Sequence, residues 1–214
     1  MPLRLHQREA LDAWRRNISA GVSRGWIVLP PGAGKTMVGV RAIRESGRTG
    51  VVFSPNIAIR GQWQAAAPEV RCLTYQALAN FGDDPGGSTQ LARLHPNGRA
   101  LVAELAVTEN LMIVLDECHH LLRTWGRLLA EVLGLLSDAV VLGLTATPAT
   151  ALTGAEATLE NELFGEIMYS ATIPQVVAAG DLAPYQELGW LTNPTAAERD
   201  WLGEQQGRVQ ELLT

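Results

Sequence analysis

Two short stretches of this sequence carry side chains whose types and spacing could act on a phosphate. The first, residues 29–36, reads LPPGAGKT and contains Lys35, the only lysine in the chain. A glycine-rich turn between a strand and a helix lets backbone N–H groups surround a phosphate at the positive end of the helix dipole. Lys35 would then place a compact ammonium on the terminal phosphates, and the hydroxyl of Thr36 would coordinate Mg²⁺. A planar guanidinium is too wide for this position, which explains a lysine in a chain that otherwise uses arginine.

The predicted phosphate-binding residues form one continuous run. They are Pro31, Gly32, Ala33, Gly34, Lys35 and Thr36. The strict phosphate-loop pattern begins with a glycine, and this chain has Leu29 at that position. Taken alone, the motif leaves open a plain glycine-rich turn with a solvated lysine.

The second stretch, LMIVLDECHH, is an apolar run that ends abruptly in polar residues at Asp116. A carboxylate at a strand end beside a phosphate loop can hold Mg²⁺, and the next one can orient and deprotonate the attacking water. We assign the first role to Asp116 and the second to Glu117, so the predicted catalytic residues are Lys35, Asp116 and Glu117. A zinc site is a poor alternative, because these potential ligands are contiguous and consecutive strand residues point to opposite faces.

A third polar strand end follows in GLTATPAT, residues 143–150. Thr145 and Thr147 could relay the nucleotide state by hydrogen bonding near His119. By itself this stretch is little more than the end of a strand.

The elements that must position these residues alternate along the chain. Apolar runs at 26–30, 50–55, 70–74, 111–117 and 140–148 predict strands, and helical periods predict helices at 5–20, 35–45, 99–107 and 121–136. Nearly continuous apolar runs indicate strands covered on both faces. We therefore expect an α/β fold with a mostly parallel sheet flanked by helices, and with its ligands at the carboxyl edge. Residues 80–89, NFGDDPGGST, predict a surface loop.

Composition narrows the class of protein. The formal net charge is −5, so contact with nucleic acid would have to be local. Two cysteines in unrelated contexts cannot build a disulfide framework. The sequence shows neither an export signal nor a membrane span, and we expect a cytoplasmic protein with no membrane partner.

The order of these three motifs resembles the first motor domain of superfamily 2 helicases and translocases, over nearly the whole chain. IVLPPGAGKT, VLDECHHL, GLTATP and GDLAPY are most similar to XPB-like repair helicases and restriction-enzyme translocase subunits. The resemblance implies a RecA-like phosphate-loop NTPase domain that uses ATP and Mg²⁺ and acts on nucleic acid, with DNA favoured over RNA. The residues after TATP lack the basic residue usual in the XPB-like group.

The resemblance also assigns roles to weaker stretches. LRLHQREAL looks like an adenine-reading segment, which implies that Gln7 bonds the adenine edge and Arg4 packs near it. The alternative is an ordinary amphipathic first helix. Two further segments look like nucleic-acid backbone contacts, and their candidate residues are Ser54, Pro55, Arg60, Gln62, Thr74, Tyr75 and Gln76. We expect the neighbouring Trp63 to be a core residue.

We expect a RecA-like ATP-binding domain at residues 1–185, followed at 186–214 by a linker and a helix that leads toward a second RecA-like domain. Thr195 and Glu198 form a capping box, and the apolar face Ala197, Trp201, Val209 and Leu212 has no stop signal, which suggests that the natural chain continues. The facing lobe carries the arginine finger in this family, so we expect the chain alone to be a weak ATP hydrolase. A nucleotide-gated binding module without motor activity and a small-molecule kinase remain alternatives. The kinase is disfavoured because this sequence shows no acceptor-binding lid.

Overall fold

The structure is a computed structural model. It describes residues 2–78, 89–118, 126–136, 138–148, 152–184, 186, 193 and 195–201. The chain divides into two compact units, Met1–Ala183 and Pro184–Thr214. The chemistry predicted above belongs to the first unit.

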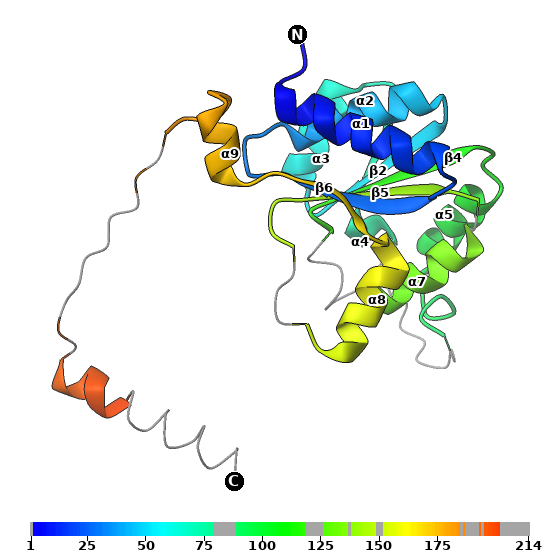
Figure 1. The fold of residues 1–214 in the computed structure, drawn as a ribbon. Helices are drawn as coiled ribbons and strands as arrows, with labels where there is room; N and C mark the ends of the chain where they lie inside the picture. Colours follow the sequence, from blue (N-terminus) through cyan, green and yellow to red (C-terminus); the bar gives the residue numbers. More distant parts are fainter. Residues whose placement is uncertain are drawn as a thin grey trace. The chain divides into compact units, whose positions relative to one another are not determined.

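A parallel sheet forms the centre of the first unit (Figure 1). In the described part of the chain it has six strands in the order β3-β2-β4-β5-β1-β6, and each neighbouring pair is parallel. The strands are β1 (Arg24–Val28), β2 (Thr49–Ser54), β3 (Arg71–Thr74), β4 (Leu111–Asp116), β5 (Val140–Thr145) and β6 (Ile167–Ser170). All carboxyl ends therefore meet at one edge of the sheet.

Helices cover both faces of this sheet. They are α1 (Leu5–Ser19), α2 (Lys35–Ser46), α3 (Ile57–Ala66), α4 (Tyr75–Leu78), α5 (Pro96–Ala106), α7 (Gly126–Leu135), α8 (Gly154–Phe164) and α9 (Ile173–Ala178). Figure 1 shows α1, α2 and α3 on one face and α4, α5, α7 and α8 on the other.

Two apolar cores result, one on each face. Along β2, Val51 and Phe53 belong to the core under α5 and α7, and Val52 belongs to the core under α1 and α2. Because side chains alternate along a strand, a strand buried on both sides must be apolar at every position. β4 and β5 are buried at all their positions, as the continuous apolar runs predicted.

The α/β prediction is confirmed, and the five predicted strands correspond to β1–β5 with shifted ends. The first two predicted helices correspond to α1 and α2, and α5 begins at Pro96, earlier than predicted. The helix predicted at 121–136 corresponds to α7 from Gly126; residues 121–125 and nearly all of the predicted loop at 80–89 lie outside the described residues.

Sequence analysis missed β6, α3, α4, α8 and α9. β6 is a short edge strand that is exposed at both ends and partly buried between them, so it lacks the continuous apolar run that marked the other strands. α3 was interpreted only as a ligand-contacting segment, although Asn56 caps it by accepting a hydrogen bond from the N–H of Ile59 at 2.9 Å.

The capping box predicted in the second unit is present. The N–H of Thr195 donates to Glu198 Oε2 at 2.7 Å, and the N–H of Glu198 donates to Thr195 Oγ1 at 3.3 Å. Residues 196–201 are helical, and Trp201 at their end is 58% exposed. Val209 and Leu212 lie outside the described residues. Within the described parts of both units, no helix combines the length and apolar character needed to cross a membrane.

Candidate active site

The glycine-rich loop connects β1 to α2 at the carboxyl edge of the sheet. The N–H of Leu29 donates to the carbonyl of Thr145 at 2.9 Å, which fixes the start of the loop to the end of β5. Gly32 and Gly34 have φ of 76° and 87°, in the left-handed region. The left-handed conformation favours glycine at position 34, and an added Cβ would also displace the Gln7 side chain, whose Nε2 would lie 2.3 Å away. Helix α2 then begins at Lys35, with its free N–H groups at the loop.

The loop and the acidic strand end meet in space. Lys35 Nζ lies 3.2 Å from Glu117 Oε1, and these two side chains are 12% and 23% exposed. β5 separates β1 from β4 in the sheet, so this contact bridges two strands that are not neighbours. The two motifs therefore belong to one site.

Asp116 lies at the end of β4 and is 4% exposed. Its Oδ2 accepts a hydrogen bond from the indole N–H of Trp63 at 2.7 Å, and its Oδ1 accepts one from the N–H of Glu117 at 3.1 Å. Burial raises the pKa of this carboxyl, as does the charge of Glu117, whereas the Trp63 hydrogen bond and the Lys35 ammonium lower that pKa.

Glu117 adopts a backbone conformation that is rare for its type. Its φ is 52°, in the left-handed region, and only Asn110 shares this among the described non-glycine residues. Strained residues of this kind gather at functional sites, where the surrounding structure holds them in place. Here the turn ends the extended strand and allows two consecutive carboxylates to serve one site.

The structure fits the predicted Mg²⁺ site. Asp116 and Thr36 offer a carboxylate and a hydroxyl, the oxygen ligands that Mg²⁺ prefers. Each Asp116 oxygen accepts one N–H and keeps a lone pair for a further ligand. In the described residues, no group of three His, Cys, Asp or Glu side chains could hold a metal.

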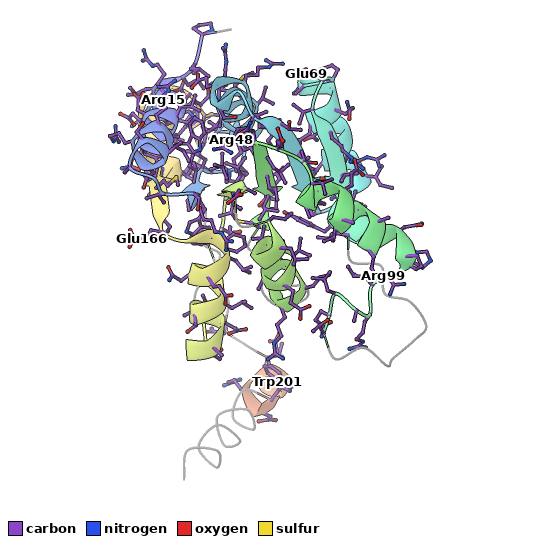
Figure 2. The ribbon with its side chains drawn as sticks, turned by 90° about the vertical axis from the view of Figure 1, so that its right-hand side faces the viewer. Arg15, Arg48, Glu69, Arg99, Glu166 and Trp201 are labelled. Carbon is purple, nitrogen blue, oxygen red and sulfur yellow. The ribbon has the colours of Figure 1, made fainter. Side chains whose placement is uncertain are left out.

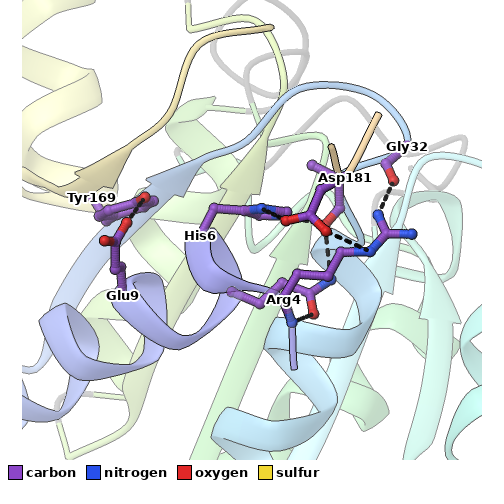
Figure 3. Close-up of polar contacts among 8 residues, drawn as sticks. Arg4, His6, Glu9, Gly32, Tyr169 and Asp181 are labelled. Carbon is purple, nitrogen blue, oxygen red and sulfur yellow. Dashed lines mark hydrogen bonds and ion pairs between the residues drawn. The ribbon is translucent and has the colours of Figure 1, made fainter. Parts of the chain in front are cut away.

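The predicted adenine-reading segment packs directly on the phosphate loop. Gln7 Nε2 donates to the carbonyl of Ala33 at 2.9 Å, and Gln7 Oε1 accepts the N–H of Arg4 at 3.0 Å. The Arg4 guanidinium donates to the carbonyl of Gly32 at 3.3 Å (Figure 3). His6, which was not singled out, lies 2.8 Å from the Ala33 carbonyl through Nε2. These contacts make the segment a support for the loop, and its contact with adenine stays a prediction.

Asp181, which follows α9, is a further residue that sequence analysis missed. Its Oδ1 lies 3.8 Å from Arg4 Nε, and its Oδ2 lies 3.3 Å from His6 Nδ1 (Figure 3). This His6 nitrogen is buried and makes no hydrogen bond, although the Asp181 carboxylate lies beside it. Asp181, which was quoted only within the resemblance stretch GDLAPY, therefore connects the end of α9 to the start of the chain.

A second polar pair lies beside this cluster. The Tyr169 hydroxyl donates to Glu9 Oε2 at 2.6 Å, and burial and the carboxylate raise the pKa of Tyr169 (Figure 3). Both residues line a depression of about 330 Å³ between α1, β6 and α9.

The predicted coupling residues lie at the end of β5. Thr145 is fully buried, and its Oγ1 accepts the N–H of the exposed Thr147 at 3.2 Å. His119 lies outside the described residues.

The predicted nucleic-acid residues separate into two groups. The Ser54 hydroxyl is buried and donates to the Leu73 carbonyl at 3.1 Å, and Tyr75 is buried and donates to the Asp116 carbonyl at 2.8 Å. Their side chains therefore contact protein. The other candidates are at least partly exposed, and they are Pro55, Arg60, Gln62, Thr74 and Gln76.

Trp63 is fully buried, which confirms its prediction as a core residue. Its hydrogen bond to Asp116 was not foreseen, because an apolar position in a sequence says nothing about which polar atom an indole N–H will meet.

Two larger depressions lie at the opposite, amino edge of the sheet. They measure about 480 and 470 Å³ and share Arg48 (labelled in Figure 2), Leu105 and Thr108. The starts of β2 and β4, at Thr49 and Leu111, also line them. Neither depression includes a residue of the candidate site.

Comparison with known proteins agrees with this geometry. Residues 1–150 match the family described as "Type III restriction enzyme, res subunit". The chain is 30% identical over 208 residues to the DNA 3'-5' helicase XPB of Mycobacterium tuberculosis, covering 92% of this chain and 35% of that protein. It is 29% identical over 146 residues to the DNA 3'-5' translocase XPB2 of Sulfurisphaera tokodaii, covering 68% and 31%. The chain thus spans about a third of the length of these relatives.

A solved structure shares the fold. The ATP-dependent Type ISP restriction-modification enzyme LlaBIII bound to DNA matches with a TM-score of 0.56 at 14% identity, over 84% of this chain and 16% of that one.

Proposed function

This chain belongs to the family described as "Type III restriction enzyme, res subunit" and is a first RecA-like motor domain of the superfamily 2 helicase type, and from that membership we propose that it binds ATP·Mg²⁺ and uses hydrolysis to drive movement on DNA. The named relatives are a DNA helicase and a DNA translocase. Their names favour a motor over a nucleotide-gated binding module.

One observation carries the proposal: Lys35 Nζ lies 3.2 Å from Glu117 Oε1. The N–H groups at the start of α2 and the Lys35 ammonium would bind the phosphate oxygens of ATP. Thr36 and Asp116 would hold Mg²⁺, which neutralises charge on those oxygens when bound. Glu117, which is partly exposed, would orient a water molecule and accept its proton. Arg4 and Gln7 would contact the adenine.

We assign the DNA contacts to the exposed side chains on and around α3 and α4, chiefly Arg60, Gln62 and Gln76. Polar side chains and a local arginine suit backbone contacts in a chain whose net charge is −5. Thr145 and Thr147, with His119, would relay the nucleotide state to these segments.

A second RecA-like domain completes the proposed mechanism. An arginine supplied from a facing lobe contributes roughly 10³ to 10⁵ in rate to related nucleotide hydrolases. The chain by itself is therefore expected to bind ATP well and to hydrolyse it slowly.

The test measures equilibrium binding of fluorescent mant-ATP and steady-state ATP hydrolysis, with and without duplex DNA or duplex RNA. Glu117→Gln is compared with Glu109→Gln, which removes the same charge near the amino end of β4. We expect all three proteins to bind nucleotide and only Glu117→Gln to lose turnover. Absence of nucleotide binding by the unmodified chain, or equal loss in both variants, would overturn the proposal.

A further inference from the structure

Trp63 links three parts of the site through one side chain. It lies on α3, it is fully buried, and its Nε1 donates to Asp116 Oδ2 at 2.7 Å. Buried indole N–H groups need an acceptor, and here the acceptor is the carboxylate assigned to Mg²⁺.

The same indole ring rests against α2. A Cβ on Gly39 would lie 2.4 Å from Trp63 Cη2 and 3.1 Å from Cζ3, so the ring occupies the space that any larger residue at position 39 would need. α2 begins at Lys35, about one turn before Gly39. A displacement of the indole would therefore shift both α2, the helix that follows the phosphate loop, and the Asp116 carboxylate.

The outer side of α3 carries proposed DNA contacts. Arg60 and Gln62 are exposed on this helix, and Trp63 is its only buried residue. Ile59 of α3 is partly buried and also packs against this core, but Trp63 is the α3 side chain whose hydrogen bond would carry a movement of the helix to Asp116.

Tyr75 makes a parallel connection from the other proposed DNA-contacting segment. Its hydroxyl donates to the Asp116 carbonyl at 2.8 Å, and its ring stacks on Phe53 with centroids 6.2 Å apart. Both segments thus reach the same residue, one at its side chain and one at its backbone.

We propose that Trp63 is a positioning residue, which orients the Asp116 carboxylate for Mg²⁺ and transmits the position of α3 to it; this inference rests on the proposed function. Two N–H donors, from Trp63 and Glu117, hold the two carboxylate oxygens in one orientation. Removing the indole N–H leaves a buried acceptor without that donor and frees the carboxylate to turn. Groups that orient metal ligands typically change metal affinity by about 10- to 100-fold when they are removed.

The decisive variant is Trp63→Phe, which keeps an aromatic ring and removes the N–H. Trp14→Phe is a matched control, because Trp14 is also buried and its Nε1 has no hydrogen-bond partner among the described residues. Gly39→Ala is a second variant that keeps the N–H and displaces the ring. Thermal unfolding establishes that each protein is folded.

The readout is mant-ATP binding in EDTA and during a Mg²⁺ titration, with no turnover required. We expect Trp63→Phe to bind nucleotide normally in EDTA and to need roughly tenfold more Mg²⁺ for tight binding. Gly39→Ala should shift in the same direction and Trp14→Phe should not shift. Duplex DNA should lower the Mg²⁺ requirement of the unmodified chain and should do so less in Trp63→Phe, since linkage is reciprocal.

An unchanged Mg²⁺ requirement in folded Trp63→Phe would overturn the positioning role. An undiminished DNA effect in that variant would overturn transmission from α3. If the unmodified chain binds nucleotide without any dependence on Mg²⁺, the proposed function itself is wrong.

Discussion

The ammonium of Lys35 and the carboxylate of Glu117 lie 3.2 Å apart, so the phosphate loop and the end of β4 are joined by an ion pair between two proposed catalytic groups. A terminal phosphate bound in the loop would compete for the same ammonium. Phosphate binding would therefore release the Glu117 carboxylate toward water, and this exchange of partners would link substrate binding to activation of the base.

Lys35→Arg tests whether this position needs an ammonium or only a positive charge. We expect ATP affinity to fall by roughly tenfold or more, because the wider guanidinium cannot keep the charge-assisted hydrogen bonds of a slim ammonium in the loop. Mant-ATP titration measures the change. Arg15→Lys, an exchange in the opposite direction on the exposed part of α1 (Figure 2), should leave affinity unchanged. Equal affinity of Lys35→Arg and the unmodified chain would show that charge alone suffices.

Gly34→Ala should abolish tight nucleotide binding. The added Cβ would meet Gln7 Nε2 at 2.3 Å, and φ of 87° is strained for any residue with a side chain. The matched control is Gly134→Ala, an exposed position on α7 with nothing within 4 Å of the new Cβ. That control should raise the free energy of unfolding by about 1 kcal/mol, measured by urea denaturation. Full nucleotide binding by Gly34→Ala would contradict the loop geometry.

Asp181→Asn should weaken ATP binding modestly while turnover at saturating ATP stays the same. Asp181 holds Arg4 and His6 where they contact the loop carbonyls, but Arg4 is 42% exposed along its side chain and the pair is screened by water. Removing an exposed ion pair of this type should lower ATP affinity by up to about fivefold. Asp138→Asn, at the amino edge, serves as the control. A drop in turnover without a change in affinity would place Asp181 in a different role.

The stability of the fold should decline in alkaline solution, in part because of Cys118. Burial raises the pKa of this thiol well above its usual range, and the charges of Glu117 and Asp116 add to the shift. The unfolded chain therefore loses this proton first, so the stabilisation is complete below the ordinary thiol pKa of about 8.5 and is lost as pH rises above it. Urea denaturation between neutral and alkaline pH measures the slope. Cys118→Ala should flatten it, and an identical slope would exclude the thiol.

Local sequence signals predicted five of the six described strands and the two halves of the candidate active site. Strands buried on both faces must be apolar throughout, so β4 and β5 were recognisable, and the polar residues at their ends marked the carboxyl edge. The meeting of Lys35 and Glu117 followed from the rule that parallel strands align their ends.

Contacts that depend on tertiary packing could not be predicted in this way. No sequence signal near Asp181 indicates that it would reach Arg4. Its position beside Arg4 depends on the path of the chain through β6 and α9, and β6 has no strong strand signal. Trp63 was predicted as a core residue, but its hydrogen-bond partner Asp116 lies 53 residues further along the chain, at the end of β4. Sequence patterns specify which side chains are buried, and the assembled fold determines which buried polar atoms meet.

At position 117, thermal stability and catalysis favour different residues because the backbone is left-handed. Glycine is the residue that best tolerates a φ of 52°, so Glu117→Gly is the exchange that would most relax this turn. The same exchange would remove the proposed base. Selection of variants for thermal tolerance alone would therefore be expected to drift toward an inactive protein at this position, and screens on this chain need to score turnover together with melting temperature.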